Sequence, residues 1–119
     1  MIPDYQTLML PLLKSVSDGN EYKFSDVVST LANQFNLTEE ERNELLPSGT
    51  AFLFSNRVGW ARTYLKKAGL LEAPRRGFMQ ISDRGKQTLS ENLSEITVQY
   101  LGKFPEFIQF KLAKDEPTE

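Results

Sequence analysis

The sequence predicts a mainly α fold with a small β component, that is, a single α+β domain. Three observations support this. Apolar residues recur three and four positions apart in several segments, which is the period of an amphipathic helix. Short runs at residues 21–24 and 78–81 have the composition of strands instead. The length of 119 residues, 39% of them hydrophobic, is enough for one small core and too short for two full-sized domains.

The first predicted helix covers residues 4–17, because its apolar side chains follow the helical period. Asp4 stands at its start as the expected N-cap. Pro11 lies inside this segment and is tolerated there only as a kink. A turn at residues 18–20 then leads into a short strand at residues 21–24.

Two more helices are predicted before the centre of the chain. Ser25 is the expected N-cap of a helix at residues 26–35. Thr38 is followed three positions later by a glutamate, so it opens a capping box and a short helix that reaches Leu46. The segment Pro47-Ser48-Gly49 then interrupts the helical pattern.

The next helix is the most informative element of the sequence. It is predicted to follow Ser55, as its N-cap, and to stop at Gly69. At about 100° per residue, five apolar side chains form one stripe along it. They are Phe54, Val58, Ala61, Leu65 and Ala68. The opposite side carries Asn56, Gly59, Thr63 and Lys66, flanked by Arg62 and Lys67. This helix therefore buries one side and presents polar and basic groups on the other.

A β-hairpin is predicted directly after this helix. Two short extended runs, at residues 70–73 and 78–81, flank a basic turn formed by Arg75-Arg76-Gly77. Pro74 cannot donate a backbone hydrogen bond, so its strand is expected at an edge of the sheet. The hairpin thus presents two arginines at its tip.

The C-terminal third is predicted to be helical with a polar end. Ser82 is the expected cap of a fourth helix, and a last helical segment is predicted at residues 94–104, interrupted by Pro105. Residues 3–110 form the predicted domain, and residues 111–119 are expected to be a tail or the start of a linker. The aromatic residues just beyond Pro105 are interpreted as core or as a docking patch for another domain.

Charge is concentrated in one part of the chain. The formal net charge is −2, yet residues 57–86 carry a net charge of +6. Their basic side chains are Arg57, Arg62, Lys66, Lys67, Arg75, Arg76, Arg84 and Lys86. A localised positive face attracts a polyanion without making the whole molecule adhesive. A solvated helix face with scattered Lys and Arg is the alternative interpretation.

The predicted order of helix, strand, helix, amphipathic helix, hairpin and helix is that of a winged helix-turn-helix with a short β-hairpin wing and an extra C-terminal helix. In this design one helix enters the DNA major groove and the wing reaches the flanking backbone. The predicted DNA-binding residues of the recognition helix are Asn56, Arg57, Gly59, Arg62, Thr63, Lys66 and Lys67. Those of the wing are Arg75, Arg76 and Gly77. A winged helix used for protein contact is the alternative.

Several function classes are excluded or disfavoured. The chain has no Cys and no His, which removes thiol nucleophiles, disulfides, the usual zinc sites and the common catalytic triads. Asp4 and Glu21-Tyr22-Lys23 imitate a nuclease motif but fall on a helix cap and a short strand, so we expect no metal site, no cofactor and no catalysis. No apolar run of about 18 residues exists and the N-terminus lacks a signal peptide. The chain is therefore expected to be cytoplasmic, with no membrane partner.

Four segments within residues 56–85 follow one another in a fixed order. They are the stretch Asn56-Arg57-Val58-Gly59-Trp60-Ala61-Arg62, the helix end Leu65-Lys66-Lys67-Ala68-Gly69-Leu70-Leu71, the turn Pro74-Arg75-Arg76-Gly77 and the helix entry Ile81-Ser82-Asp83-Arg84-Gly85. Together they resemble the N-terminal domain of Mrr-type restriction proteins. The opening at residues 3–13 is also similar to the start of that family. The resemblance implies a winged-helix module that binds double-stranded DNA. In the family this module normally precedes a nuclease domain that cuts modified, typically methylated, DNA. That nuclease domain is missing from this sequence.

We therefore expect the target-recognition half of an Mrr-like restriction endonuclease, with DNA and a C-terminal nuclease domain as its partners. A stand-alone winged-helix transcriptional regulator and a protein-interaction winged helix are the alternatives. A homodimer is compatible with each of these. Trp60 is expected to pack at the edge of its helix, under the wing, rather than to stack on a base.

Overall fold

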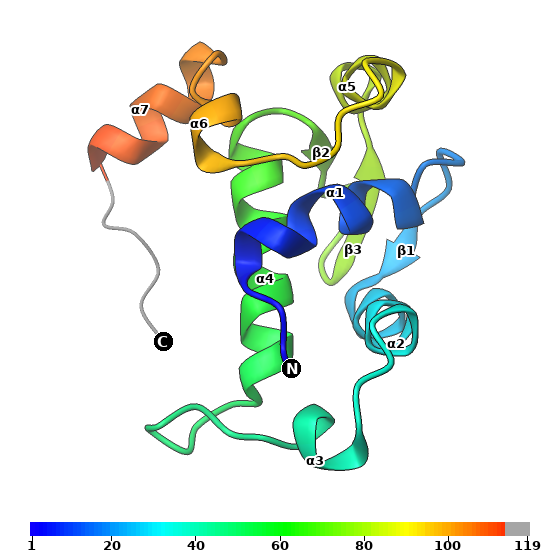
Figure 1. The fold of residues 1–119 in the computed structure, drawn as a ribbon. Helices are drawn as coiled ribbons and strands as arrows, with labels where there is room; N and C mark the ends of the chain where they lie inside the picture. Colours follow the sequence, from blue (N-terminus) through cyan, green and yellow to red (C-terminus); the bar gives the residue numbers. More distant parts are fainter. Residues whose placement is uncertain (114–119) are drawn as a thin grey trace.

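The computed structural model describes residues 1–113; the predicted tail at residues 114–119 lies outside the described residues. Short helices surround a small sheet (Figure 1). In chain order the elements are α1 (Tyr5–Ser15), β1 (Tyr22–Lys23), α2 (Phe24–Gln34), α3 (Glu39–Arg42), α4 (Leu53–Lys67), β2 (Leu71–Glu72), β3 (Phe78–Ile81), α5 (Asp83–Ser90), α6 (Val98–Leu101) and α7 (Pro105–Ala113). The predicted fold class is confirmed: the fold is mainly α, α+β and winged-helix-like.

The sheet joins the hairpin to a strand from much earlier in the chain. Its order is β1-β3-β2 and both pairs are antiparallel, with Tyr22 opposite Met79 and Leu71 opposite Ile81. β2 and β3, with the turn between them, form the wing. Pro74 lies in that turn, beyond the paired residues of β2. Because β1 pairs with the far strand of the hairpin, the wing is attached to the body of the domain on both sides.

The core lies where α1 crosses α4 (Figure 1). The predicted apolar stripe of α4 is confirmed, since each of its five residues is at most 2% exposed. They pack against fully buried residues of α1, which include Leu8, Leu12 and Leu13. Burying these side chains removes a large apolar area from water, the main term that stabilises a domain of this size. This packing leaves the opposite side of α4 outside the core.

Three helix caps predicted from the sequence are present. The Asp4 carboxylate accepts a hydrogen bond from the Thr7 N–H at 2.8 Å. Thr38 and Glu41 form the predicted capping box. The Ser82 hydroxyl accepts from the Gly85 N–H at 3.0 Å. In each case a side-chain oxygen satisfies a backbone donor that the first helical turn leaves without an intrahelical partner.

Three predicted helix boundaries are wrong, because pairings with backbone outside each helix decide where the helix begins or ends. Ser25 does not cap α2, which begins at Phe24, whose N–H donates to the Gly77 carbonyl at 2.9 Å. Ser55 does not cap α4, whose N-cap is Phe52, three residues earlier. Leu45 forms an antiparallel bridge with Phe52, so α3 ends at Arg42 rather than at Leu46.

The prediction for the last helical segment is also wrong. Pro105 does not interrupt a helix but begins α7, a position where a missing N–H is no loss and the fixed φ suits a helix. Only Val98–Leu101 of the segment before it is helical. Phe107 is 1% exposed and stacks edge-on against Tyr64 of α4, which confirms part of this aromatic segment as core. α7 is thereby fixed beside α4.

Candidate nucleic-acid interface

The side of α4 turned away from the core lies between two flanking elements. We call it the polar face of α4: Asn56, Gly59, Thr63 and Lys66, with Arg62 and Lys67 at its edges. The wing flanks one side of this helix and α7 the other (Figure 1). Lys66 and Lys67 are exposed, and the remaining members of the face are half-buried. The polar face is therefore accessible along its length but bounded on both sides.

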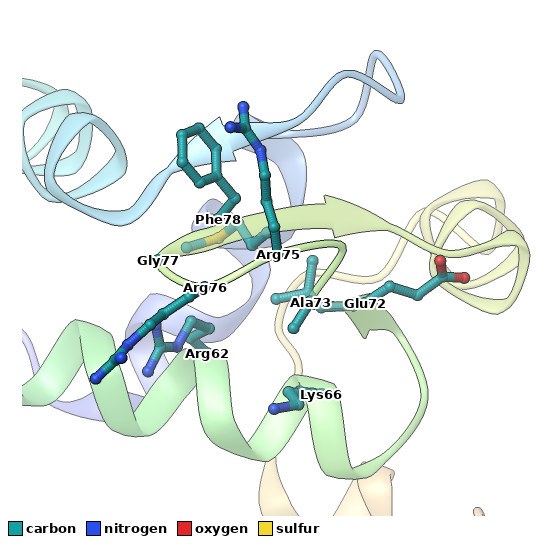
Figure 2. Close-up of a pocket in the computed structure, with 10 residues that line it drawn as sticks. Arg62, Lys66, Glu72, Ala73, Arg75, Arg76, Gly77 and Phe78 are labelled. Atoms are coloured by element: carbon teal, nitrogen blue, oxygen red, sulfur yellow. The ribbon is translucent and has the colours of Figure 1, made fainter.

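A cavity of about 290 Å³ lies between α4 and the wing, and we call it the wing cavity. Arg62 and Lys66 line it from α4, and Arg76 and Gly77 line it from the turn of the wing. Figure 2 shows the side chains of Arg62 and Arg76 extending side by side, whereas Glu72 points away. Two elements thus bring three cations together with no carboxylate between them in this view. Such a cluster suits a phosphate group, which accepts charge-assisted hydrogen bonds from several donors.

The two arginines of the wing have different surroundings. The Arg75 Nε lies 2.9 Å from the Glu21 carboxylate, and its guanidinium sits 3.7 Å above the Phe78 ring. Arg75 and Phe78 also line the wing cavity, but their side chains extend together away from α4 (Figure 2). No ion pair of Arg76 is found among residues 1–113, and its side chain is exposed. Arg75 is therefore held by contacts within the domain, whereas Arg76 has no ion pair among the described residues and can contact a ligand.

Arg62 is held at the base of the wing cavity. Its guanidinium lies 4.7 Å from the centre of the Phe24 ring, a cation–π contact with the first residue of α2. Partial burial lowers the pKa of Arg62 from its ordinary value. Guanidinium groups nevertheless remain charged in proteins, so this residue supplies a fixed positive charge beside α4.

Two glycines keep backbone accessible at this site. A Cβ on Gly59 would meet only the Phe24 ring, at 3.8 Å, which is an ordinary van der Waals contact. Gly77 has a φ of +81°, a left-handed conformation that glycine adopts without strain, and a Cβ there would meet nothing within 4 Å. Neither glycine is needed to relieve crowding inside the domain. Both leave open surface where another molecule can approach the backbone closely.

The structure does not bring Arg57 to the polar face. Its guanidinium donates hydrogen bonds to the carbonyls of Ile2 and Pro3 at 3.0 and 3.2 Å. These contacts hold the N-terminal segment against α4. Arg84, another member of the basic window, donates to the Ala68 carbonyl at 2.8 Å and pairs with Glu106 at 2.7 Å. Both arginines connect elements of the domain.

A second depression, of about 520 Å³, lies on the α7 side, and we call it the α4–α7 groove. It is lined by Asn56, Gly59, Trp60, Arg62, Thr63, Lys67 and Phe110. Trp60 packs at the helix edge as expected, but against Tyr64 on this side rather than under the wing. The sequence analysis interpreted Phe110 as core or as part of a docking patch for another domain and did not include it in the nucleic-acid interface. The pair Pro105-Glu106, typical of a first helical turn, is the signal that would have revealed α7.

Within residues 1–113, no cluster of three or more Asp and Glu side chains is placed to hold a metal ion. Asp4, the aspartate of the apparent nuclease motif, is occupied as a helix cap. In the described part of the chain, no helix has the length and apolar character needed to cross a membrane.

The domain is winged-helix-like, and it carries a cationic face between α4 and the wing. Comparison with known proteins gives the family: residues 5–91 match the Mrr N-terminal domain, and the chain belongs to that family. It is 27% identical over 99 residues to the type IV methyl-directed restriction enzyme EcoKMrr of Escherichia coli strain K12. That match covers 82% of this chain and 32% of the relative, so the chain spans about a third of that enzyme. No solved structure gives a significant match.

Proposed function

We propose that this chain binds double-stranded DNA as the target-recognition module of a restriction system that acts on modified, methylated DNA. The wing cavity is the observation that carries the proposal, because Arg62, Lys66 and Arg76 converge there from two elements. The similarity to a methyl-directed restriction enzyme supports it. Cleavage is assigned to a nuclease domain of the full-length protein, and a cytoplasmic location is part of the same proposal.

The geometry suits a division of work between the helix and the wing. An α-helix fits the major groove, which is about 12 Å wide and presents a distinct donor and acceptor pattern for each base pair. Asn56 and Thr63 are uncharged and lie on the polar face, so they can read base edges. Lys66 and Arg76 carry their charge on long stems and are suited to the phosphates on either side of the wing cavity. Phosphate contacts then position the protein, and base contacts specify the sequence.

The salt dependence of binding tests this proposal. With phosphate contacts from Arg62, Lys66, Lys67 and Arg76, the log–log slope of affinity against salt should be about −3 to −4. The double variant Lys66→Ala, Arg76→Ala should weaken binding to every duplex and flatten the slope by about 2. Fluorescence anisotropy with a labelled duplex between about 50 and 200 mM salt measures both quantities.

A matched control removes the same charge elsewhere. Lys14 on α1 and Lys103 after α6 line neither the wing cavity nor the α4–α7 groove. The double variant Lys14→Ala, Lys103→Ala should therefore leave the slope unchanged. Equal effects of the two double variants would mean that net charge, not the wing cavity, governs binding. A protein that binds no duplex at about 50 mM salt would contradict the proposal and favour a protein-interaction role.

A further inference from the structure

We propose that the α4–α7 groove reads a methyl group that lies beside an exocyclic amine in the DNA major groove, with Trp60 and Phe110 as its apolar walls and Asn56 as its polar group. This inference rests on the proposed function and deepens it, since it locates the recognition of the modification. The 5-methyl of cytosine presents this chemistry, because it lies beside the N4 amine, which faces the major groove. In N6-methyladenine the methyl takes the place of the N6 hydrogen that faces the groove, so this base offers the methyl without the donor.

The position of the groove is the first argument. At about 100° per residue, the polar face of α4 has Arg62 at its wing-side edge, and Trp60 lies just beyond Lys67 at its other edge, on the α7 side. The groove opens on this same face, because Asn56, Gly59 and Thr63 line it. A duplex held by the wing cavity therefore lies across the groove. A base edge presented to Thr63 would have Phe110 beside it.

The chemistry of the walls is the second argument. A surface that served phosphates alone would need cations and hydrogen-bond donors, yet Trp60 and Phe110 bring two aromatic rings to the edge of this one. Arg62 and Lys67 also line the groove, and the Lys67 Nζ lies 5.6 Å from the centre of the Phe110 ring, so the aromatic walls stand beside cations that suit the DNA backbone. Aromatic and apolar side chains are the groups that contact base methyls in the major groove.

The rings are also fixed in place before any ligand arrives. Trp60 and Phe110 each pack edge-on against Tyr64, with ring centroids 6.1 and 5.5 Å apart. Tyr64 is fully buried, and Phe107, also buried, anchors the same helix as Phe110. Walls supported in this way lose little side-chain freedom on binding, which favours discrimination of a group as small as a methyl.

The Asn56 amide supplies the polar part of the site. Its Oδ1 is shielded from solvent and has no hydrogen-bond partner within residues 1–113. Such an acceptor is costly to leave unsatisfied, so an incoming N–H donor would be favoured. Asn56 as a whole is half-buried and lines the groove, and a change of rotamer on binding would be needed to bring Oδ1 to its surface. The N4 amine of cytosine, beside the 5-methyl group, is such a donor in the major groove.

The experiment uses duplex pools of random sequence, so the preferred sequence need not be known. One pool is unmethylated, one is synthesised with N6-methyladenine in place of adenine, and one with 5-methylcytosine in place of cytosine. The chain should bind one methylated pool about fourfold or more tightly than the unmethylated pool, the factor expected from burying one methyl-sized group. The pool that shows the preference identifies the base.

Variants then locate the reading site. Phe110→Ala and Trp60→Ala should reduce the preference for the methylated pool to about one. Leu112→Ala, on the exposed side of the same helix, is the matched control and should keep the preference. Phe110→Leu retains apolar volume to hold α7 if the alanine variant unfolds, and it should also lower the preference. Thermal melts of all variants establish that the fold is intact.

The outcomes separate this inference from the proposed function. Equal binding of all three pools would overturn the inference and leave duplex binding standing. A methyl preference that survives both Phe110→Leu and Trp60→Ala would also overturn it, because the methyl would then be read elsewhere. Absence of binding to every pool would instead refute the proposed function itself.

Discussion

Replacing Gly59 by alanine should make the domain more stable and a poorer DNA binder. Gly59 lies inside α4, where glycine is less favourable than alanine by about 0.5–1 kcal/mol. The added Cβ would lie 3.8 Å from the Phe24 ring, an ordinary contact that costs nothing. The expected gain in the free energy of unfolding is therefore close to the full difference in helix propensity. For a chain of this length it should raise the melting temperature by about 2–6 °C.

The same methyl group would stand on the polar face of α4. If this face lies against base edges, the Cβ keeps the α4 backbone away from them and every neighbouring contact lengthens. We expect the affinity for duplex DNA to fall by about tenfold or more, which is the loss of one good contact. Circular-dichroism melts and anisotropy titrations of the same preparations measure the two effects together.

A control with a similar gain in stability isolates the effect on binding. Thr30→Ala, at an exposed position inside α2, raises helix propensity by a comparable amount and lies outside the wing cavity and the α4–α7 groove. It should melt higher and bind DNA as the parent does. A lower melting temperature for Gly59→Ala would refute the packing argument at Phe24. Unchanged affinity would refute the close approach of DNA to α4.

Three further changes test the structure around this site. Gly85→Ala should destabilise the domain by about 2–4 kcal/mol in thermal or urea unfolding, because its Cβ would lie 2.3 Å from the Leu70 carbonyl oxygen. A hydrogen bond from the Tyr22 hydroxyl at 2.6 Å lowers the pKa of the Asp18 carboxyl. The stability that this bond contributes is therefore present above the ordinary aspartate pKa and is lost as the pH falls through the lowered value. Tyr22→Phe should return the pKa of Asp18 toward its ordinary value in a carboxyl NMR titration, and an unmoved titration would contradict this cause. Arg84→Met removes the hydrogen bond to the end of α4 and the ion pair to α7, so limited proteolysis should cut α7 faster than in the parent.

The parts of the fold that depend on local sequence were predictable. The stripe from Phe54 to Ala68 was read from its spacing alone, because a helical period is visible within one segment. The hairpin followed from Arg75-Arg76-Gly77, a turn whose glycine the structure places at positive φ. The cap at Ser82 followed from its place before a polar, helix-forming run. Each of these signals lies within a few residues of the feature that it predicts.

The features that the sequence did not predict depend on pairings between different segments of the chain. The start of α4 is set by the bridge between Leu45 and Phe52, which no local pattern announces. The partner of Arg75 is Glu21, which lies 54 residues earlier and reaches it because β1 pairs with β3. Predicting the α4–α7 groove would have required the position of Phe110, which depends on how α7 packs against Tyr64. Tertiary packing decides such contacts, and spacing along one segment does not contain them.

The clamp on Arg75 has a consequence for the thermodynamics of association. A free arginine at a hairpin tip samples many rotamers, and ordering such a side chain on binding costs about 0.5–1.5 kcal/mol. Arg75 has already lost this freedom in the unbound domain, through Glu21 on one side and the Phe78 ring on the other. Part of the ordering of the wing is therefore completed on folding, whereas Arg76, which has no ion pair among residues 1–113, still loses side-chain freedom when it binds a phosphate.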